Sequence, residues 1–379
     1  MESVERLLRD LVAIDSVNPT LVPGAAGEAA VARRVIQELE GIGLQIEVQE
    51  VAPGRPNVVG TLTGRAPGAS LMLCGHLDTV GVAGMAAPFD PVVLDGRMHG
   101  RGTQDMKSGV AAMIDAVRVV AEGGGLAAGQ VVVACVVDEE HSSIGADALV
   151  TRWRADAGIV TEPTDLDVAV CHKGFAWSEV VTTGRAAHGS RPADGIDAIV
   201  HMGRVLVALG DLDRRLQAGA RHPRLGPASL HASIISGGHE ISSYPDRCTL
   251  QIERRTLPGE PESVLASEVD GILARLSAAD PAFAATATSL FARPPYEIDG
   301  AHPLPEVLVQ SARAAGCRAT TIGMSFWTDA AVLAGAGIPS VLFGPTGAGL
   351  HSVDEWVDLA SLRQCRDALT GAIRGWCRA

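Results

Sequence analysis

The feature that most constrains the fold is the apolar run at 130–137, which has the length of one strand and contains no charged residue. A strand that is apolar on both sides must be covered on both sides, as the strands of parallel sheets are. Further strands are predicted at 44–50, 57–63, 70–74, 156–161 and 167–172, and helices at 2–15, 27–40, 106–121 and 144–152. This alternation predicts an α/β domain with a mostly parallel sheet flanked by helices.

The order of the predicted elements changes after residue 174. From 175 to 292 it is strand, helix, strand, strand, helix, strand, which is the ferredoxin-like α+β order. Helices and strands alternate again over 303–376, and 379 residues are too many for one ordinary core. We therefore expect one α/β domain, residues 1–174 and 293–379, with an inserted domain at 175–292 and candidate hinges at the joints.

The composition excludes several classes of function. A net charge of −13, with 47% hydrophobic and 20% charged residues, is typical of a soluble protein and argues against nucleic-acid or anionic-membrane partners. No run reaches the roughly 20 apolar residues of a membrane span, and the N-terminal segment lacks the layout of a signal peptide. The seven scattered cysteines, without a C-x-x-C pair, indicate reduced thiols, so a cytoplasmic location is expected.

Histidines and acidic residues follow several of the predicted strands. His76 and Asp78 follow strand 70–74, Asp138-Glu139-Glu140 follows strand 130–137, and Glu162 follows strand 156–161. In an open α/β sheet, ligands bind outside the carboxyl ends of the strands. Each residue taken singly has a structural alternative, such as a polar strand end or a solvated acidic loop.

Two more residues extend this set. Asp105 follows a glycine-containing loop and precedes a predicted helix, where an N-cap carboxylate is the alternative; His351 follows a Gly-rich loop. Together, two imidazoles and three carboxylates suit two zinc-like ions bridged by a carboxylate, about 3.5–4 Å apart. The predicted ligands are His76, Asp105, Glu140, Glu162 and His351. Of the two adjacent glutamates, one would ligate a metal and the other would take a proton from water.

These motifs resemble the co-catalytic zinc aminoacylase / carboxypeptidase G metallopeptidase family, which includes acetylornithine deacetylase and succinyl-diaminopimelate desuccinylase. The resemblance covers nearly the whole chain and rests on segments 75–79, 100–107, 138–140, 162–164 and 184–188, and on His351 with Glu355. It implies a zinc-exopeptidase-like fold with an inserted lid and dimerisation domain. The implied activity is that of a binuclear metal-dependent amidohydrolase that removes the acyl group from an N-acyl amino acid.

The resemblance also assigns roles. His76 and Glu162 would hold one metal, Glu140 and His351 the other, and Asp105 would bridge them, with a cis peptide bond after it. Asp78 would orient His76, and Glu139 would be the general base. His188 would hydrogen-bond the oxyanion, often from the partner subunit of a homodimer. Two zinc ions are expected, with cobalt or manganese as alternatives.

The substrate pocket is where this chain departs from the pattern. Arg255 would clamp a substrate carboxylate, and Gly237 and Gly238 lie in a matching segment. Relatives often have an Asn three residues before the Pro where this chain has Ser242 before Pro245. The alternatives are therefore a metallo-exopeptidase acting on dipeptides or on an acylated C-terminal residue, and, in another class, a non-catalytic amino-acid-binding protein.

Overall fold

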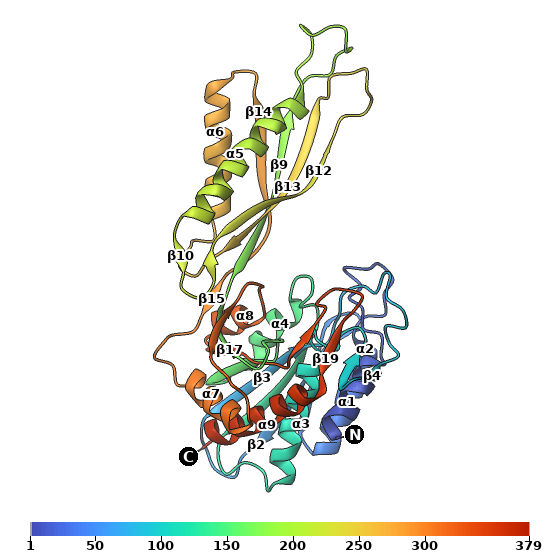
Figure 1. The fold of residues 1–379 in the computed structure, drawn as a ribbon, viewed down its shortest axis with the longest axis vertical. Coiled ribbons are helices and arrows are strands. Elements are labelled where there is room, and N and C mark those ends of the chain that lie inside the picture. The colour runs from blue at the N-terminus through green and yellow to red at the C-terminus, as the bar shows by residue number, and fades with distance from the viewer. Residues whose placement is uncertain (1, 379) are drawn as a thin grey trace. The chain divides into compact units, whose positions relative to one another are not determined.

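The computed structural model describes residues 2–378, which form two compact units (Figure 1). The main unit contains the residues up to Val170, Ile298–Gly323 and the residues from Thr328 onward. The inserted unit contains Cys171–Glu297 and Met324–Trp327. These limits lie close to the joints expected after residues 174 and 292.

A mixed sheet runs through the main unit in the order β1-β2-β6-β3-β7-β17-β8. Its strands are β1 (Gln45–Ala52), β2 (Arg55–Thr63), β3 (Ser70–His76), β6 (Gln130–Val136), β7 (Ala157–Val160), β8 (Val168–His172) and β17 (Ser340–Leu342); β15 (Tyr296–Glu297) and β16 (Thr321–Met324) also pair with β8. The central strands β6, β3, β7 and β17 are parallel, and the β1–β2, β2–β6 and β17–β8 pairs are antiparallel. The predicted α/β fold is confirmed, with its parallel part at the centre.

Helices with apolar residues at helical spacing cover this sheet. They are α1 (Ser3–Val12), α2 (Ala29–Ile42), α3 (Lys107–Glu122), α4 (Ile144–Arg152), α7 (Leu304–Ala314), α8 (Ala330–Gly335) and α9 (Leu359–Trp376). In α1, for example, Leu7, Leu8 and Leu11 lie on one side and are at most 2% exposed. Helix α3 packs between α1, α9 and the sheet, which buries most of its side chains. None of the helices within residues 2–378 is both long and apolar enough to cross a membrane.

A second, small antiparallel sheet in the main unit has the order β18-β19-β5-β4. It consists of β4 (Val92–Leu94), β5 (Arg97–His99), β18 (Gly347–Ala348) and β19 (Trp356–Asp358). Strand β5 pairs with β19, from His99 opposite Trp356 to Arg97 opposite Asp358. This pairing brings the loop that follows β5 next to the segment that precedes β19. These strands have two or three residues each, and none of them was predicted from the sequence.

The inserted unit contains an antiparallel sheet in the order β12-β13-β9-β14. Its elements are β9 (Gly174–Thr183), α5 (Ala198–Ala218), β10 (Arg221–His222), β11 (Gly226–Pro227), β12 (Ser229–Gly237), β13 (Arg247–Thr256), α6 (Val264–Ala279) and β14 (Ala284–Arg293). Val180, Met202, Leu250 and Val269 form part of the core between this sheet and the two helices. Apart from the short β10–β11 hairpin, this is the predicted ferredoxin-like order.

Candidate metal centre

Three neighbouring parallel strands end at the same edge of the main sheet. His76 is the last residue of β3 and aligns with Val136, the last residue of β6, while Cys74 aligns with Val160, the last residue of β7. The segment 138–140, which follows β6, and Glu162, which follows β7, therefore lie close to the imidazole of His76. Parallel pairing of apolar strands is thus what gathers these polar side chains.

The five predicted ligands converge, with Asp105 between the two histidines. Its Oδ1 lies 3.0 Å from Nε2 of His76, and its Oδ2 lies 3.3 Å from Nε2 of His351. Glu162 Oε1 lies 3.7 Å from Nε2 of His76, and Glu140 Oε2 lies 3.1 Å from Nε2 of His351. The side chains thus form two sets, each with one histidine and one glutamate, which share Asp105.

Glu139 belongs to the same cluster on the side of His76. Its Oε2 lies 3.8 Å from Nε2 of His76, and ligand atoms of His76, Glu139 and Glu162 lie within 4.8 Å of one another. By distance alone Glu139 could ligate a cation or act on a water molecule beside it. The adjacent Asp138 is turned away, because its carboxylate pairs with Arg55 and accepts the hydroxyl of Ser142.

The electrostatics show that this cluster lacks positive charge. Burial, followed by the charges of neighbouring carboxylates, raises the pKa of Glu139 and Glu162 well above their usual range and that of Glu140 to about 7. Hydrogen bonds with Asp105 and Glu140 raise the pKa of His351 to about 10. Burial alone would lower the pKa of His76, but Asp105 and nearby glutamates raise it well above its usual value. Divalent cations would supply the charge that these protons now supply.

The donor set fits such cations. Nδ1 of His76 contacts the main-chain oxygen of Asp78 at 2.9 Å, so this nitrogen keeps its proton, and Nε2 would present a lone pair once a cation displaces its own proton. Oε1 of Glu140 is buried and has no hydrogen-bond partner within residues 2–378. Imidazole nitrogen and carboxylate oxygen together suit zinc, cobalt or manganese.

Because protons occupy these ligands at neutral pH, metal binding should release them. The pKa values of about 10 for His351 and about 7 for Glu140 apply to the metal-free protein. We expect zinc affinity to rise between about pH 6 and pH 9, with at least about one proton released per ion at pH 7. Calorimetric titration in buffers of different ionisation enthalpy measures both quantities. An affinity independent of pH across this range would contradict the prediction.

Asp78, predicted to orient His76, contacts Nδ1 of that imidazole through its main-chain oxygen. Its carboxylate Oδ1 lies 3.7 Å from Nδ1 of His76. The same carboxylate accepts hydrogen bonds from the main-chain N–H groups of Glu139 and Glu140, each at 3.2 Å. The carboxylate of Asp78 therefore contacts the backbone that carries the glutamate pair.

Glu355 holds the loop of Asp105 in place. The sequence motif that contains Glu355 did not predict this role. The buried carboxylate of Glu355 accepts the main-chain N–H groups of Gly102 (3.0 Å), Gln104 (2.8 Å) and Asp105 (3.1 Å), and Nη1 of Arg101 (2.6 Å). One side chain thus fixes the loop of Asp105 to the segment that carries His351. The only sequence signal is that Glu355 lies four residues after His351.

Replacing Glu355 with Gln should disturb both the loop that carries Asp105 and the segment that carries His351. An amide offers one acceptor oxygen to four donors, and breaking a buried charged pair costs about 3–5 kcal/mol. We expect a lower melting temperature and about 10–100-fold weaker zinc binding. Glu260→Gln, which alters the buried Arg254 pair of the inserted unit, should lower stability but keep zinc affinity. Unchanged zinc affinity in Glu355→Gln would rule out the role described.

The other predicted residues lie in the inserted unit. His188 is exposed, and its Nδ1 accepts the N–H of Ser190 at 3.2 Å, which leaves the proton on Nε2 as a donor. Arg255 pairs with Glu253 and lies 5.6 Å from the centroid of the Phe175 ring. Ser242 accepts the N–H of Gly189 through its carbonyl; Gly237 ends β12, and Gly238 follows it. Their roles toward a substrate stay predictions.

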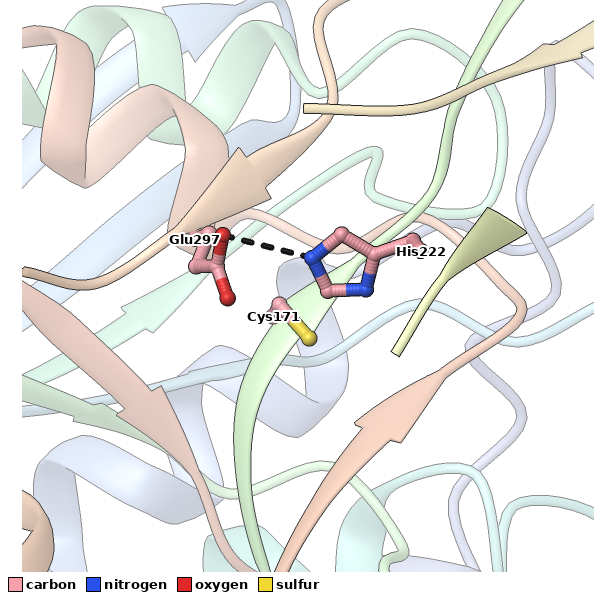
Figure 2. Close-up of side chains that lie close together, drawn as sticks. All are labelled: Cys171, His222 and Glu297. Carbon is pink, nitrogen blue, oxygen red and sulfur yellow. Dashed lines mark hydrogen bonds and ion pairs between the residues drawn. The ribbon is translucent and has the colours of Figure 1, made fainter. Parts of the chain in front are cut away.

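A second cluster, Cys171, His222 and Glu297, also brings possible ligand atoms within 4.8 Å (Figure 2). Nδ1 of His222 accepts the N–H groups of Arg224 and Leu225, so Nε2 carries the proton and donates to Glu297 at 3.3 Å. A metal on Nε2 would force a proton onto Nδ1, facing these two N–H groups. Burial, followed by the charge of Glu297, raises the pKa of the Cys171 thiol to about 11. We interpret the cluster as a hydrogen-bonded pair beside a buried thiol; all seven cysteines are free.

An α/β sheet that gathers histidines and carboxylates at the ends of its parallel strands defines a metal-dependent hydrolase. Residues 72–375 match the family described as Peptidase family M20/M25/M40, and the chain belongs to this family. The relatives of this family that match the chain are metal-binding hydrolases of amide bonds, and they act as deacylases or peptidases.

The chain is 29% identical to an acetylornithine deacetylase of Proteus mirabilis, over 98% of this chain and 96% of the relative. It is 28% identical to the N-formyl-4-amino-5-aminomethyl-2-methylpyrimidine deformylase of Bacillus subtilis, over 94% and 92%. Among solved structures, a Staphylococcus aureus tripeptidase has a TM-score of 0.84 at 24% identity, covering 100% of this chain and 98% of its own. A dinuclear metal-binding peptidase of Bacillus subtilis has a TM-score of 0.74 at 17% identity, over 98% and 97%.

Proposed function

We propose that the protein is a binuclear zinc amidohydrolase that removes the acyl group from an N-acyl amino acid. The observation that carries the proposal is the position of Asp105, whose two carboxylate oxygens face two different histidines. Each histidine has its own glutamate partner, Glu162 or Glu140. A carboxylate shared in this way is what a pair of cations needs as a bridge.

When bound, the cations would polarise the substrate carbonyl and make a water molecule more acidic. Glu139 then takes the proton from the attacking water and passes it to the nitrogen that leaves. In the metal-free protein, burial raises the pKa of Glu139 above its usual range, so this carboxylate binds a proton more readily than an exposed glutamate does. His188, with its proton on Nε2, is suited to donate a hydrogen bond to the oxyanion.

The acetylornithine deacetylase and the deformylase named above both remove an acyl group from an amine, which favours a deacylase over a peptidase. The second candidate is a metallo-exopeptidase acting on dipeptides or tripeptides. It is supported by the peptidases among the structures of similar fold. Arg255, if it clamps the substrate carboxylate, would serve either substrate.

The test is hydrolysis of a matched panel. N-formyl, N-acetyl and N-succinyl amino acids, dipeptides and tripeptides are each assayed with the zinc-loaded protein, with the chelator-treated protein, and after zinc is restored. We expect the acyl amino acids to give the highest kcat/KM, with activity lost to chelator and regained with zinc. Preference for peptides would establish the second candidate, and hydrolysis that survives chelation would refute both.

We also propose a cytoplasmic homodimer that assembles through the inserted unit. Strand β12 is at an edge of its sheet, and its Ile234 and Ile235 are 61% and 53% exposed. Val200 and Val207 of α5, which packs against β12, are 55% and 67% exposed. Exposed edges with β-branched residues are commonly covered by another chain. Sedimentation should give a dimer for the native chain and a monomer for Ile235→Glu; a native monomer would exclude the assembly.

A further inference from the structure

A buried polar network lies behind the glutamate pair and begins at Arg55, the first residue of β2. Its guanidinium contacts the carboxylate of Glu28 through Nε at 2.9 Å, and Nη1 lies 2.8 Å from Oδ1 of Asp138. Glu28, Asp138 and Asp78 are each at most 1% exposed. Three buried carboxylates therefore belong to this network, and Arg55 contacts two of them, Glu28 and Asp138.

Asn18 contacts the third carboxylate of this network, that of Asp78. Its side chain is fully buried, and Nδ2 donates to Oδ2 of Asp78 at 2.8 Å and to Oδ1 of Asp138 at 3.1 Å. Its Oδ1 accepts the N–H of Thr20, and its main-chain N–H donates to Thr79, so the amide cannot turn over without losing partners. Asn18 is thus a neutral donor held between two carboxylates that would otherwise repel each other.

The two carboxylates on either side of Asn18 fix the backbone of the catalytic loop. Asp78 accepts the N–H groups of Glu139 and Glu140. The carboxylate of Asp138 accepts the hydroxyl of Ser142 at 2.7 Å, and its main-chain carbonyl accepts the N–H groups of Ser142 and Ser143, at 3.1 and 2.6 Å. Moving either carboxylate would therefore move the loop that carries the general base and one metal ligand. In a metal centre, a displacement of about 1 Å can cost about 10²-fold in rate.

We propose that Asn18 is a positioning residue for the reaction: its amide joins Asp78 to Asp138 and so sets the orientation of Glu139 and Glu140. The inference rests on the proposed function for its kinetic consequence, but the geometry of the bound metal reports on it independently. Substitution of Asn18 should change the ligand geometry at the centre and slow the chemical step, while substrate binding is largely kept.

The test compares Asn18→Asp with the native protein and with Asp115→Asn. The first substitution keeps the shape of the side chain but places a third carboxylate between two. The second alters an equally buried polar group of α3, which contacts Ser3 and Arg366. The measurements are the visible spectrum of the cobalt-substituted protein, the melting temperature, and kcat and KM for the best acyl amino acid. We expect a changed cobalt spectrum and a kcat about 10–100-fold lower in Asn18→Asp, with KM within about threefold, and neither change in Asp115→Asn.

If Asn18→Asp does not fold, Asn18→Ser replaces it, since its hydroxyl can donate to one carboxylate only and should give a smaller loss of the same kind. A native cobalt spectrum together with a kcat within about twofold of native, in either folded variant, would overturn the proposal. So would the failure of both variants to fold, which would make Asn18 a folding residue. A native protein that hydrolyses no substrate would refute the proposed function, while the cobalt spectra would still decide the role of Asn18.

Discussion

Replacing Glu139 with Gln is expected to lower kcat by at least about 10³-fold while both metal ions stay bound. The amide keeps the size of the side chain but cannot take a proton from water, and general acid–base catalysis contributes about 10²–10⁴-fold. Glu139 Oε2 lies 3.8 Å from Nε2 of His76, whereas Asp105 lies 3.0 Å from His76 and Glu140 lies 3.1 Å from His351. Steady-state kinetics and metal analysis by mass spectrometry give the two quantities.

The adjacent glutamate supplies the matched control. Glu140→Gln should lose one of the two ions, because Glu140 shares its site with His351 at 3.1 Å. Since Glu139 also lies within ligand distance of His76 and Glu162, an alternative assignment makes Glu139 a ligand and leaves Glu140 as the base. Loss of an ion from Glu139→Gln, with both ions kept in Glu140→Gln, would establish that reversed assignment.

Gly109→Ala is expected to have the second large effect, although Gly109 is not a ligand. Gly109 lies in the first turns of α3, and a Cβ added there would collide with the main-chain carbonyl of Thr161, the residue before Glu162. Either α3 or the end of β7 must move. Overpacking of this kind costs about 1–3 kcal/mol, and a shift of Glu162 by about 1 Å should lower kcat about 10²-fold. Thermal unfolding and kinetics measure both.

Gly41→Ala is the matched control for backbone entropy. Gly41 is in α2, and a Cβ there would meet no atom within 4 Å, so alanine should stabilise the helix by about 0.5–1 kcal/mol. We expect Gly109→Ala to lower stability and Gly41→Ala to raise it, and this difference separates the effect of close packing from that of helix propensity. Native stability and native kcat in Gly109→Ala would show that Thr161 can move without disturbing Glu162.

The parallel part of the fold and the side chains at its strand ends could be predicted from the sequence, because both follow from local pattern. Apolar runs of strand length predicted β3, β6 and β7; His76 ends β3, and Glu140 and Glu162 come shortly after the ends of β6 and β7. Strands that are adjacent and parallel have their carboxyl ends together, and the order β6-β3-β7 in the structure brings these side chains close.

The contacts that complete the centre could not be predicted in the same way. The strands that bring the Asp105 loop to His351 are two or three residues long, too short for a periodic signal. The hydrogen bonds of Glu355, Asn18 and Asp78 join residues far apart in the chain, and their sequence positions carry no trace of the partner. The main-chain contact of Asp78 with His76 also depends on loop geometry, which residue type does not specify.

Because β5 pairs with β19, a strand near the end of the chain, the proposed metal centre can be completed only late in translation. A ribosome that has synthesised the first 170 residues has produced His76, Asp105, Glu140 and Glu162, but the whole inserted unit must be translated before His351 and β19 emerge. Until then the nascent chain carries a cluster of carboxylates with one imidazole and without the Glu355 contacts. The complete set of proposed metal ligands is therefore present only in chains whose translation has passed β19.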